Sequence, residues 1–347
     1  MRNRSTIHLF YIESYFHYLM AEGIIDKQQL SKNDILFITH RGVVVGDEYK
    51  DRVLYDGTTL QFGQRLLWYL KNRKELKEQL KGKKIISYAP FQFYYPGVLY
   101  FSEYNIIEEG FSAYSKGFEN NNWKGRLYEI AKCAIINLLF PFSGKNEKGL
   151  LLGLSYSSKF PKDKMKLYVF SDKSYGNFDF GPKIIREVIR AHKPTGGCPI
   201  SDSWVLVMDR LNPHGRPFDD EIYLKVLTTA LQSLGLGERK IYVKLHPSDV
   251  KLGEAERRVS ERLQSVGLSS EFITMSLEEI ASSNQNNCFV GTNSTSLFYA
   301  PIFGNSNVSY SFARLLAEED NEYESFLEGW GGVKSFVELF SNNVKCL

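Results

Sequence analysis

The chain has 347 residues, which is long enough for two α/β domains or one large one with an ample core. Its hydrophobic content of 43% and its charged content of 24% are typical of a globular protein, and its aromatic content of 14% is high. The formal net charge of +3 is small, so the overall charge does not indicate a nucleic acid as a partner.

Cysteine spacing and hydropathy exclude further classes of protein. The four cysteines, Cys133, Cys198, Cys288 and Cys346, form no CxxC pair, so neither a disulfide framework nor a zinc site is indicated, and a reducing cytoplasm is expected. No apolar run is long enough to predict a transmembrane span. The basic segment 71–84 fits either a solvated helix face or a surface that contacts anionic lipid, and both interpretations stay open.

The first half of the chain alternates short strands with helices. The pattern predicts strands at residues 6–11, 34–39, 84–88, 104–107 and 166–170, and helices at residues 14–22, 59–72 and 123–139. Residues 193–203, KPTGGCPISDS, are rich in Gly, Pro and Ser, and this composition marks a linker.

The second half repeats the alternation. The pattern predicts strands at residues 204–208, 240–245, 271–274 and 287–290, and helices at residues 219–234, 254–266, 277–282, 297–303 and 323–340. Two βαβ series separated by a linker predict an α/β protein with two Rossmann-like domains that face a cleft. We place these domains at residues 1–192 and 204–322, the linker at 193–203, and a C-terminal helix within 323–347 that packs back towards the N-terminal domain.

A pair of carboxylates follows the predicted strand 104–107. Glu108 and Glu109 are adjacent at a strand end, so one side chain can face a ligand while the other faces the protein, and Gly110 permits a tight turn beside them. A carboxylate with a raised pKa can serve as a general base. A charged loop without a catalytic role is the alternative interpretation.

A histidine ends the strand 240–245. Pro247 cannot donate to a strand ladder, so it stops the strand and leaves the His246 side chain at its end. Histidine can pair with a phosphate or give a proton to a departing one, although a His-Pro pair after a strand is more often an ordinary turn. Lys244 lies on the same face of the strand, where it either adds positive charge or points to solvent.

Hydroxyl side chains gather where the strand 287–290 leads into a helix. Four of the five residues 292–296 carry a hydroxyl, whereas a helix N-cap needs one. The same N-terminal N–H groups attract a phosphate, so capping and phosphate binding both fit the segment. Asp209, Arg210 and His214 follow the strand 204–208 and fit either a nucleotide pocket or a structural turn.

In this order, the three clusters resemble the motifs of bacterial sialyltransferases. Those families carry a D/E-D/E-G motif in the first domain, an HP motif in the second and a Ser/Thr-rich pair downstream. Here they stand as EEG at 108–110, HP at 246–247 and STS at 294–296. The resemblance covers the central part of the chain, includes the lipooligosaccharide sialyltransferase and capsule polysialyltransferase groups, and implies a glycosyltransferase-B fold.

The resemblance also implies a reaction, in which N-acetylneuraminic acid passes from CMP-sialic acid to a sugar hydroxyl with inversion. The domain at 1–192 would bind the acceptor, with Glu109 as base and Glu108 supporting it or exchanging roles with it. The domain at 204–322 would bind the CMP-sugar, with His246 on the leaving phosphate. The other residues placed at the donor phosphate are Ser294, Thr295, Ser296, Asn293, Pro247 and Lys244. No metal and no cofactor besides the donor substrate are expected.

The expected acceptor is an oligosaccharide or glycolipid of a bacterial surface glycan, ending in galactose. We expect a cytoplasmic enzyme, with peripheral association at the inner face of the membrane as an open question, and no nucleic-acid partner. A single-residue transfer is preferred, because the chain lacks a long extra basic region for a polyanionic acceptor. The alternatives are an α-2,8-polysialyltransferase, another nucleotide-sugar-dependent glycosyltransferase-B enzyme, and a catalytically silent glycan-binding or assembly subunit.

Overall fold

The computed structural model describes residues 5–40, 43–57, 74, 78, 80–90, 103–108, 110, 166–174, 185–190, 198–209, 211, 219–236, 240–246, 249, 254–283, 285–328 and 331–347. The chain forms two compact units. The first contains Met1–Glu109 and Gly117–His192, and the second contains Gly110–Lys116 and Lys193–Leu347. The helices predicted at 59–72 and 123–139 lie outside the described residues.

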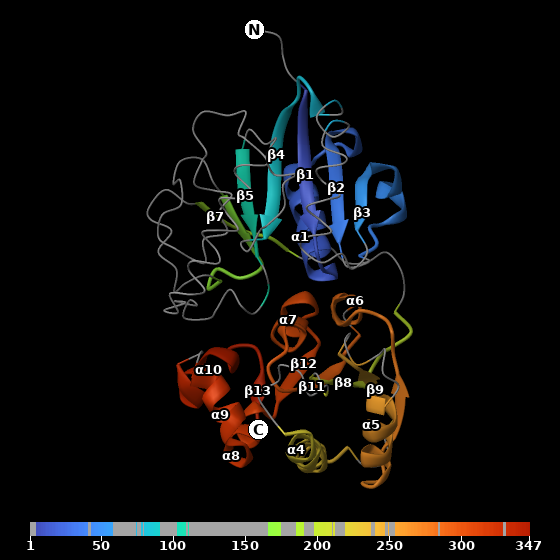
Figure 1. The fold of residues 1–347 in the computed structure, drawn as a ribbon, viewed down its shortest axis with the longest axis vertical. Coiled ribbons are helices and arrows are strands. Elements are labelled where there is room, and N and C mark those ends of the chain that lie inside the picture. The colour runs from blue at the N-terminus through green and yellow to red at the C-terminus, as the bar shows by residue number, and fades with distance from the viewer. Residues whose placement is uncertain are drawn as a thin grey trace. The chain divides into compact units, whose positions relative to one another are not determined.

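The first unit is built on a seven-stranded parallel sheet with the order β3-β2-β1-β4-β5-β6-β7 (Figure 1). Its strands are β1 (Thr6–Ile12), β2 (Ile35–His40), β3 (Val53–Gly57), β4 (Lys84–Pro90), β5 (Glu103–Ile107), β6 (Lys166–Val169) and β7 (Ile185–Val188); its described helices are α1 (Tyr15–Gln28), η1 (Lys32–Asp34) and η2 (Asp47–Arg52). The central strand β1 is buried on both faces, as parallel sheets covered by helices require. The Ser14 hydroxyl accepts a hydrogen bond from the His17 N–H and caps α1.

The second unit is built on a six-stranded parallel sheet with the order β10-β9-β8-β11-β12-β13 (Figure 1). Its strands are β8 (Trp204–Val207), β9 (Lys240–Lys244), β10 (Ser269–Phe272), β11 (Cys288–Gly291), β12 (Val308–Ser311) and β13 (Lys345–Cys346); its helices are α4 (Asp220–Ser233), α5 (Glu254–Gln264), α6 (Leu277–Ser282), α7 (Thr295–Phe303), α8 (Ala313–Glu319), α9 (Asn321–Glu328) and α10 (Gly332–Phe340). Counted from β8, the strands stand in the doubly wound order 3-2-1-4-5-6. The prediction of two Rossmann-like domains of α/β class is therefore confirmed.

The elements differ from the prediction mainly at edges and ends. Four strands, β3, β7, β12 and β13, were not predicted; β13 has two residues and the side chains of β7 are mostly exposed, so neither shows a run of buried apolar residues. The single helix predicted at 323–340 is two helices, α9, which ends at Glu328, and α10, which begins at Gly332 after Gly331 with its φ of 87°. Helix α10 packs on α7, with the rings of Phe340 and Phe298 stacked at 5.8 Å, and β13 joins β12 in the second sheet.

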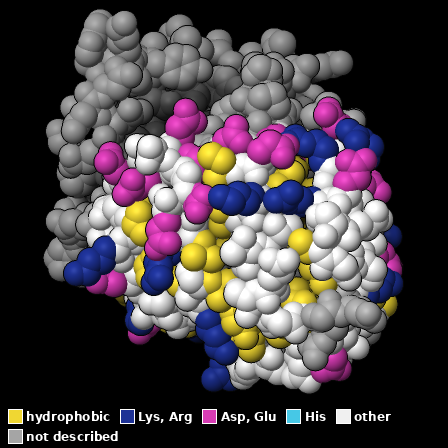
Figure 2. Space-filling view, turned by 90° about the horizontal axis from the view of Figure 1, so that it is seen from below, with side chains coloured by type: hydrophobic (Ala, Val, Ile, Leu, Met, Phe, Trp, Pro, Cys, Tyr) yellow, Lys and Arg dark blue, Asp and Glu magenta, His cyan; other side chains and the backbone are white. Residues whose placement is uncertain are grey.

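The surface drawn in Figure 2 carries both signs of charge. Lys and Arg side chains lie among Asp and Glu side chains there, so the described part of this face does not present the single-sign field that binds nucleic acid. Within the described ranges, none of the helices has the length and apolarity that a membrane span needs. The three described cysteines, Cys198, Cys288 and Cys346, carry free thiols.

Candidate functional site

The carboxyl ends of three neighbouring strands meet at one edge of the second sheet. His246 follows β9, Asp209 follows β8, and Gly291 ends β11, with β8 between the other two. The strand order reverses between β8 and β11, and open α/β sheets bind their ligands outside the carboxyl ends of strands at such a point. The topology therefore brings His246 and the segment 291–296 to one ligand-binding edge.

The His246 side chain is exposed on a backbone that is held in place. Its carbonyl accepts the Asp249 N–H at 2.9 Å in a tight turn, and the preceding Leu245 is buried. The buried Asp249 carboxylate accepts the Leu211 N–H at 2.6 Å, which ties the segment after β9 to the segment after β8. An exposed imidazole on such a turn can reach a ligand at the sheet edge. Pro247 lies outside the described residues.

The hydroxyl-rich segment begins α7. The Ser294 hydroxyl is the N-cap and accepts the Ser296 N–H at 3.3 Å, so it serves the helix itself. Helix α7 starts at Thr295, two residues earlier than predicted, for the same reason. A Cβ on Gly291 would lie 2.7 Å from the Val207 carbonyl oxygen, so glycine lets the end of β11 approach β8. The Ser294 hydroxyl thus caps the helix, and the other hydroxyls of the segment are not needed for that cap.

A carboxylate lies beside this helix start. Ser296 Oγ donates a hydrogen bond of 3.0 Å to Glu278 Oε1, from the first turn of α6. Burial raises the pKa of Glu278, opposed by this hydrogen bond and by the charge of Lys244. The Lys244 ammonium donates to the Thr274 carbonyl, and burial lowers its pKa. Because a hydroxyl has one proton, Ser296 directs its proton at Glu278.

Asp209 brings an unusual carboxyl group to the strand-order reversal. Its backbone N–H donates to the Tyr223 hydroxyl at 3.2 Å, and its Oδ2 atom is buried without a hydrogen-bond partner in the described part of the chain. Burial raises the pKa of Asp209 to about 7. A change near neutral pH therefore alters the charge at the centre of this edge.

Glu108 stands at the carboxyl end of β5 in the first unit and faces the protein. The residue is fully buried; its Oε1 accepts the Ser174 hydroxyl and its Oε2 accepts the Phe170 N–H, both at 2.7 Å. Burial raises the pKa of Glu108 to about 8, against the effect of these two hydrogen bonds. Glu109 lies outside the described residues.

Gly110, which the contacts assign to the second unit, lies against the start of α7. Its φ is +95°, and a Cβ on it would stand 2.5 Å from Thr295 Cγ2. Any larger residue at 110 would therefore meet both backbone strain and a side-chain clash. The residue that ends the EEG motif and the first residue of α7 are in close approach.

Comparison with known proteins identifies the chain. A family described as Alpha-2,8-polysialyltransferase (POLYST) matches residues 95–312, more than half of the chain, and this range contains all three motifs. The chain belongs to the alpha-2,8-polysialyltransferase family. The match confirms the resemblance to bacterial sialyltransferases, and the chain is a glycosyltransferase of the sialyltransferase class.

Solved structures give only remote likenesses to this polysialyltransferase-family chain. A 2,6-sialyltransferase of Photobacterium sp., in complex with CMP and lactose, is 10% identical, with 98% of this chain and 78% of that chain covered and a TM-score of 0.48. A UDP-GlcNAc 2-epimerase of Methanocaldococcus jannaschii is 10% identical, with 98% and 93% covered and a TM-score of 0.49. No curated protein sequence matches the chain. The fold assignment rests on the two parallel sheets.

The sequence predicted the candidate residues that follow the strands of this polysialyltransferase-family chain, but it did not predict Glu278. The structure places His246 and Ser294–Ser296 at one sheet edge, with Lys244 beside Glu278, while Asn293 stays partly exposed next to the cap. Glu278 and Glu279 are the acidic residues expected in a helix's first turn, so no local pattern singled them out. The hydrogen bond from Ser296 and the charge of Lys244 place Glu278 beside these candidate residues.

Proposed function

We propose that this sialyltransferase moves a sialic acid residue from CMP-sialic acid to a glycan hydroxyl, with inversion at the anomeric carbon. The observation that carries the donor assignment is the shared edge of the second sheet, where His246 and the start of α7 lie after strands on either side of β8. The N-terminus of a helix favours an anion, and histidine is the side chain whose charge adapts near neutral pH.

On the donor side, the bond between the anomeric carbon and the phosphate oxygen breaks, and its electron pair goes to the phosphate. His246 stabilises the leaving CMP and gives it a proton, while Thr295 and the α7 N-terminus bind its oxygens. CMP carries a single phosphate, so these groups suffice without a metal ion. Ser296 is a weaker candidate for the phosphate, because its proton faces Glu278.

On the acceptor side, Glu109 removes the proton from the attacking hydroxyl as the new bond forms opposite the departing CMP. This role goes to Glu109 because the Glu108 carboxylate is enclosed and already accepts two hydrogen bonds. Glu108 acts as a positioning residue, which fixes the chain just before the base. Inversion follows from attack on the face opposite the leaving group.

The acceptor is proposed from the family's description. An α-2,8 linkage joins one sialic acid residue to another, so we propose a glycan that ends in sialic acid. A galactose-ended acceptor, which the sequence favoured, is the second candidate. The acceptor is an oligosaccharide or glycolipid handled on the cytoplasmic side of the membrane.

The test is a transfer assay with two acceptors. The protein is incubated with CMP-sialic acid and either sialyllactose or lactose, with and without EDTA, and CMP release and product mass are followed. We expect CMP release and addition of sialic acid to sialyllactose, unaffected by EDTA. No donor consumption with either acceptor, together with no heat of CMP-sialic acid binding in calorimetry, would overturn the proposal; a panel of other nucleotide sugars then tests other donors.

A further inference from the structure

One face of the first sheet carries a polar pocket over the strands β4 to β7. The pocket has a volume of about 350 Å³, and it is lined from four adjacent strands and the last turn of α1. The lining residues are Lys27, Gln28, Ile86, Tyr88, Glu103, Asn105, Lys166, Tyr168 and Glu187. These strand residues share one face of the sheet, because they are sheet partners or alternate along a strand. The faces of parallel sheets that helices cover usually carry apolar side chains. The polar side chains on this face of the sheet therefore differ from the usual pattern and suggest a binding role.

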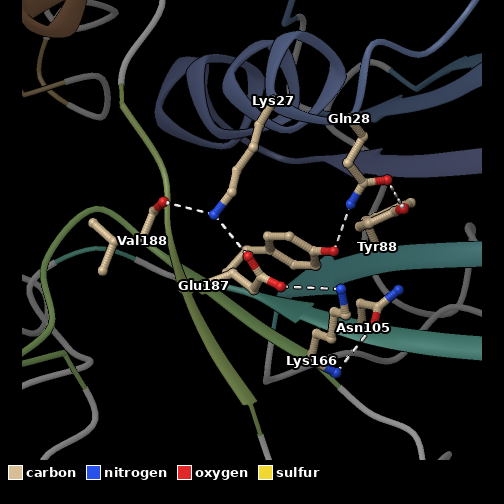
Figure 3. A network of polar contacts seen from close by, with 8 residues as sticks. Lys27, Gln28, Tyr88, Asn105, Lys166, Glu187 and Val188 are labelled. Atoms are coloured by element: carbon tan, nitrogen blue, oxygen red, sulfur yellow. Dashed lines mark hydrogen bonds and ion pairs between the residues drawn. The ribbon is translucent and has the colours of Figure 1, made fainter.

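Hydrogen bonds fix the floor of the pocket. Gln28 Nε2 donates to the Tyr168 hydroxyl at 2.6 Å, and the Tyr88 hydroxyl donates to Gln28 Oε1 at 3.2 Å. Both tyrosines are buried, and burial raises the pKa of Tyr168 to about 12 and that of Tyr88 further, so both stay neutral. Figure 3 shows the Gln28 side chain reaching from α1 towards Tyr88 on the sheet. The floor is rigid and uncharged.

The rim carries an excess of positive charge. Glu187 accepts ion pairs from Lys27 at 2.6 Å and from Lys166 at 3.0 Å (Figure 3), and both bonds hold the pKa of Glu187 below its usual range. Glu103 is balanced by Lys84 at 2.6 Å. Two ammonium groups thus share the Glu187 carboxylate, while Glu103 pairs with Lys84 from outside the lining, so these three lysines and two glutamates together carry a net charge of +1.

Hydrogen-bond donors are also left over. Asn105 Oδ1 accepts the Lys166 backbone N–H at 3.0 Å, while its Nδ2 amide has no partner among the described residues. The Lys166 ammonium, about half exposed, donates to Glu187 alone among the described side chains, which leaves further N–H bonds for a ligand. The pocket therefore suits a small ligand with one carboxylate and several hydroxyl groups, and its volume fits a sugar unit.

We propose that this pocket binds an acidic sugar unit of a glycan and so anchors the acceptor chain away from the reacting end. The inference that the ligand belongs to a glycan rests on the proposed function. Glu108 follows the end of β5, three residues after Asn105 of the pocket, which is about 10 Å along an extended strand, and alternation along the strand turns the two side chains to opposite faces of the sheet. The pocket is thus a second contact with the glycan, separate from the proposed transfer site.

The test is binding of a tetramer of α-2,8-linked sialic acid, with donor absent, measured by calorimetry and by saturation-transfer NMR. A neutral tetrasaccharide, maltotetraose, tests whether the carboxylates matter. Lys166→Met and Lys27→Met remove one rim charge each; both lysines are partly exposed, so the fold should survive, and thermal denaturation checks this. Lys50→Met, at an exposed ion pair with Asp47 elsewhere on the first unit, is the matched control.

We expect the acidic tetramer to bind wild type and Lys50→Met equally, and each rim variant at least tenfold more weakly, with maltotetraose unbound. In the transfer assay, the rim variants should lose more with a long acidic acceptor than with sialyllactose. Absent binding, or equal binding by all four proteins, overturns the pocket proposal whether or not transfer occurs. Binding without any transfer supports the pocket and counts against the proposed reaction, so the two failures are distinguishable.

Discussion

Ser174 Oγ donates a hydrogen bond of 2.7 Å to Glu108 Oε1, and this contact holds a fully buried carboxyl group at the end of β5. The folded pKa of about 8 exceeds the ordinary value of 4.5, because burial penalises the charged form more than two hydrogen bonds favour it. The folded protein therefore keeps a proton that the unfolded chain loses between these pH values.

We predict that this proton makes the protein less stable as pH rises from about 5 to about 8. One retained proton lowers the free energy of unfolding by about 1.4 kcal/mol per pH unit in that window. Glu108→Gln should reduce the slope, because a glutamine side chain does not titrate in this pH range. The fold should survive, since the glutamine can accept the Phe170 N–H and donate to the Ser174 hydroxyl. Urea unfolding at pH 5.5 and 7.5 measures it. Glu256→Gln, an exposed change on α5, is the control, and an unchanged slope in Glu108→Gln would contradict the prediction.

The contact of Gly110 with Thr295 predicts a pair of compensating substitutions. Gly110→Ala adds a Cβ 2.5 Å from Thr295 Cγ2 at a φ of +95°, so stability and CMP release should both fall. Thr295→Ser removes the clashing methyl group and should recover part of the loss in stability. Gly82→Ala separates the two causes, because Gly82 has a φ of +74° with open space around its Cβ position. Gly82→Ala should lose the stability that backbone strain alone costs, roughly 1–2 kcal/mol, measured by thermal denaturation. If Gly110→Ala loses no more stability than Gly82→Ala, the clash with Thr295 is refuted.

The hydrogen bond from Ser296 to Glu278 predicts unequal roles for neighbouring hydroxyls. Thr295→Val should weaken CMP binding about tenfold or more, the range for a hydrogen bond to a charged group. Ser296→Ala should weaken it less, because the Ser296 proton faces Glu278. Titration calorimetry with CMP compares them, and Thr229→Val, on the exposed side of α4, is the control. A larger loss in Ser296→Ala would assign the phosphate to Ser296 instead.

The exposure of His246 predicts a loss of activity without a loss of fold. His246→Ala should lower kcat by about 10²–10⁴-fold, the usual contribution of a general acid, with a small change in donor KM. The melting temperature should stay close to that of wild type, because the ring is exposed and the turn is held by backbone bonds. Lys240→Met, at the far end of the same strand, is the control. A variant that keeps wild-type kcat would remove His246 from the mechanism.

The sequence by itself determined most of the longer helices and strands among the described residues, because apolar periodicity is a local signal. The alternation through Val243 places His246 after a strand, as the structure has it. Short strands such as β13 carry no such signal, since two residues cannot show a period.

Only the tertiary structure decided which side chains meet and which are enclosed. The strand order puts β8 between β9 and β11, and so brings His246 and Ser296 to the same edge of the second sheet although they are distant along the chain. The burial of Glu108, the Ser296–Glu278 bond and the rim of Lys27 and Lys166 all join residues from distant segments. Such contacts depend on sheet register and packing between elements, which are set by the whole chain and leave no mark on any short stretch of it.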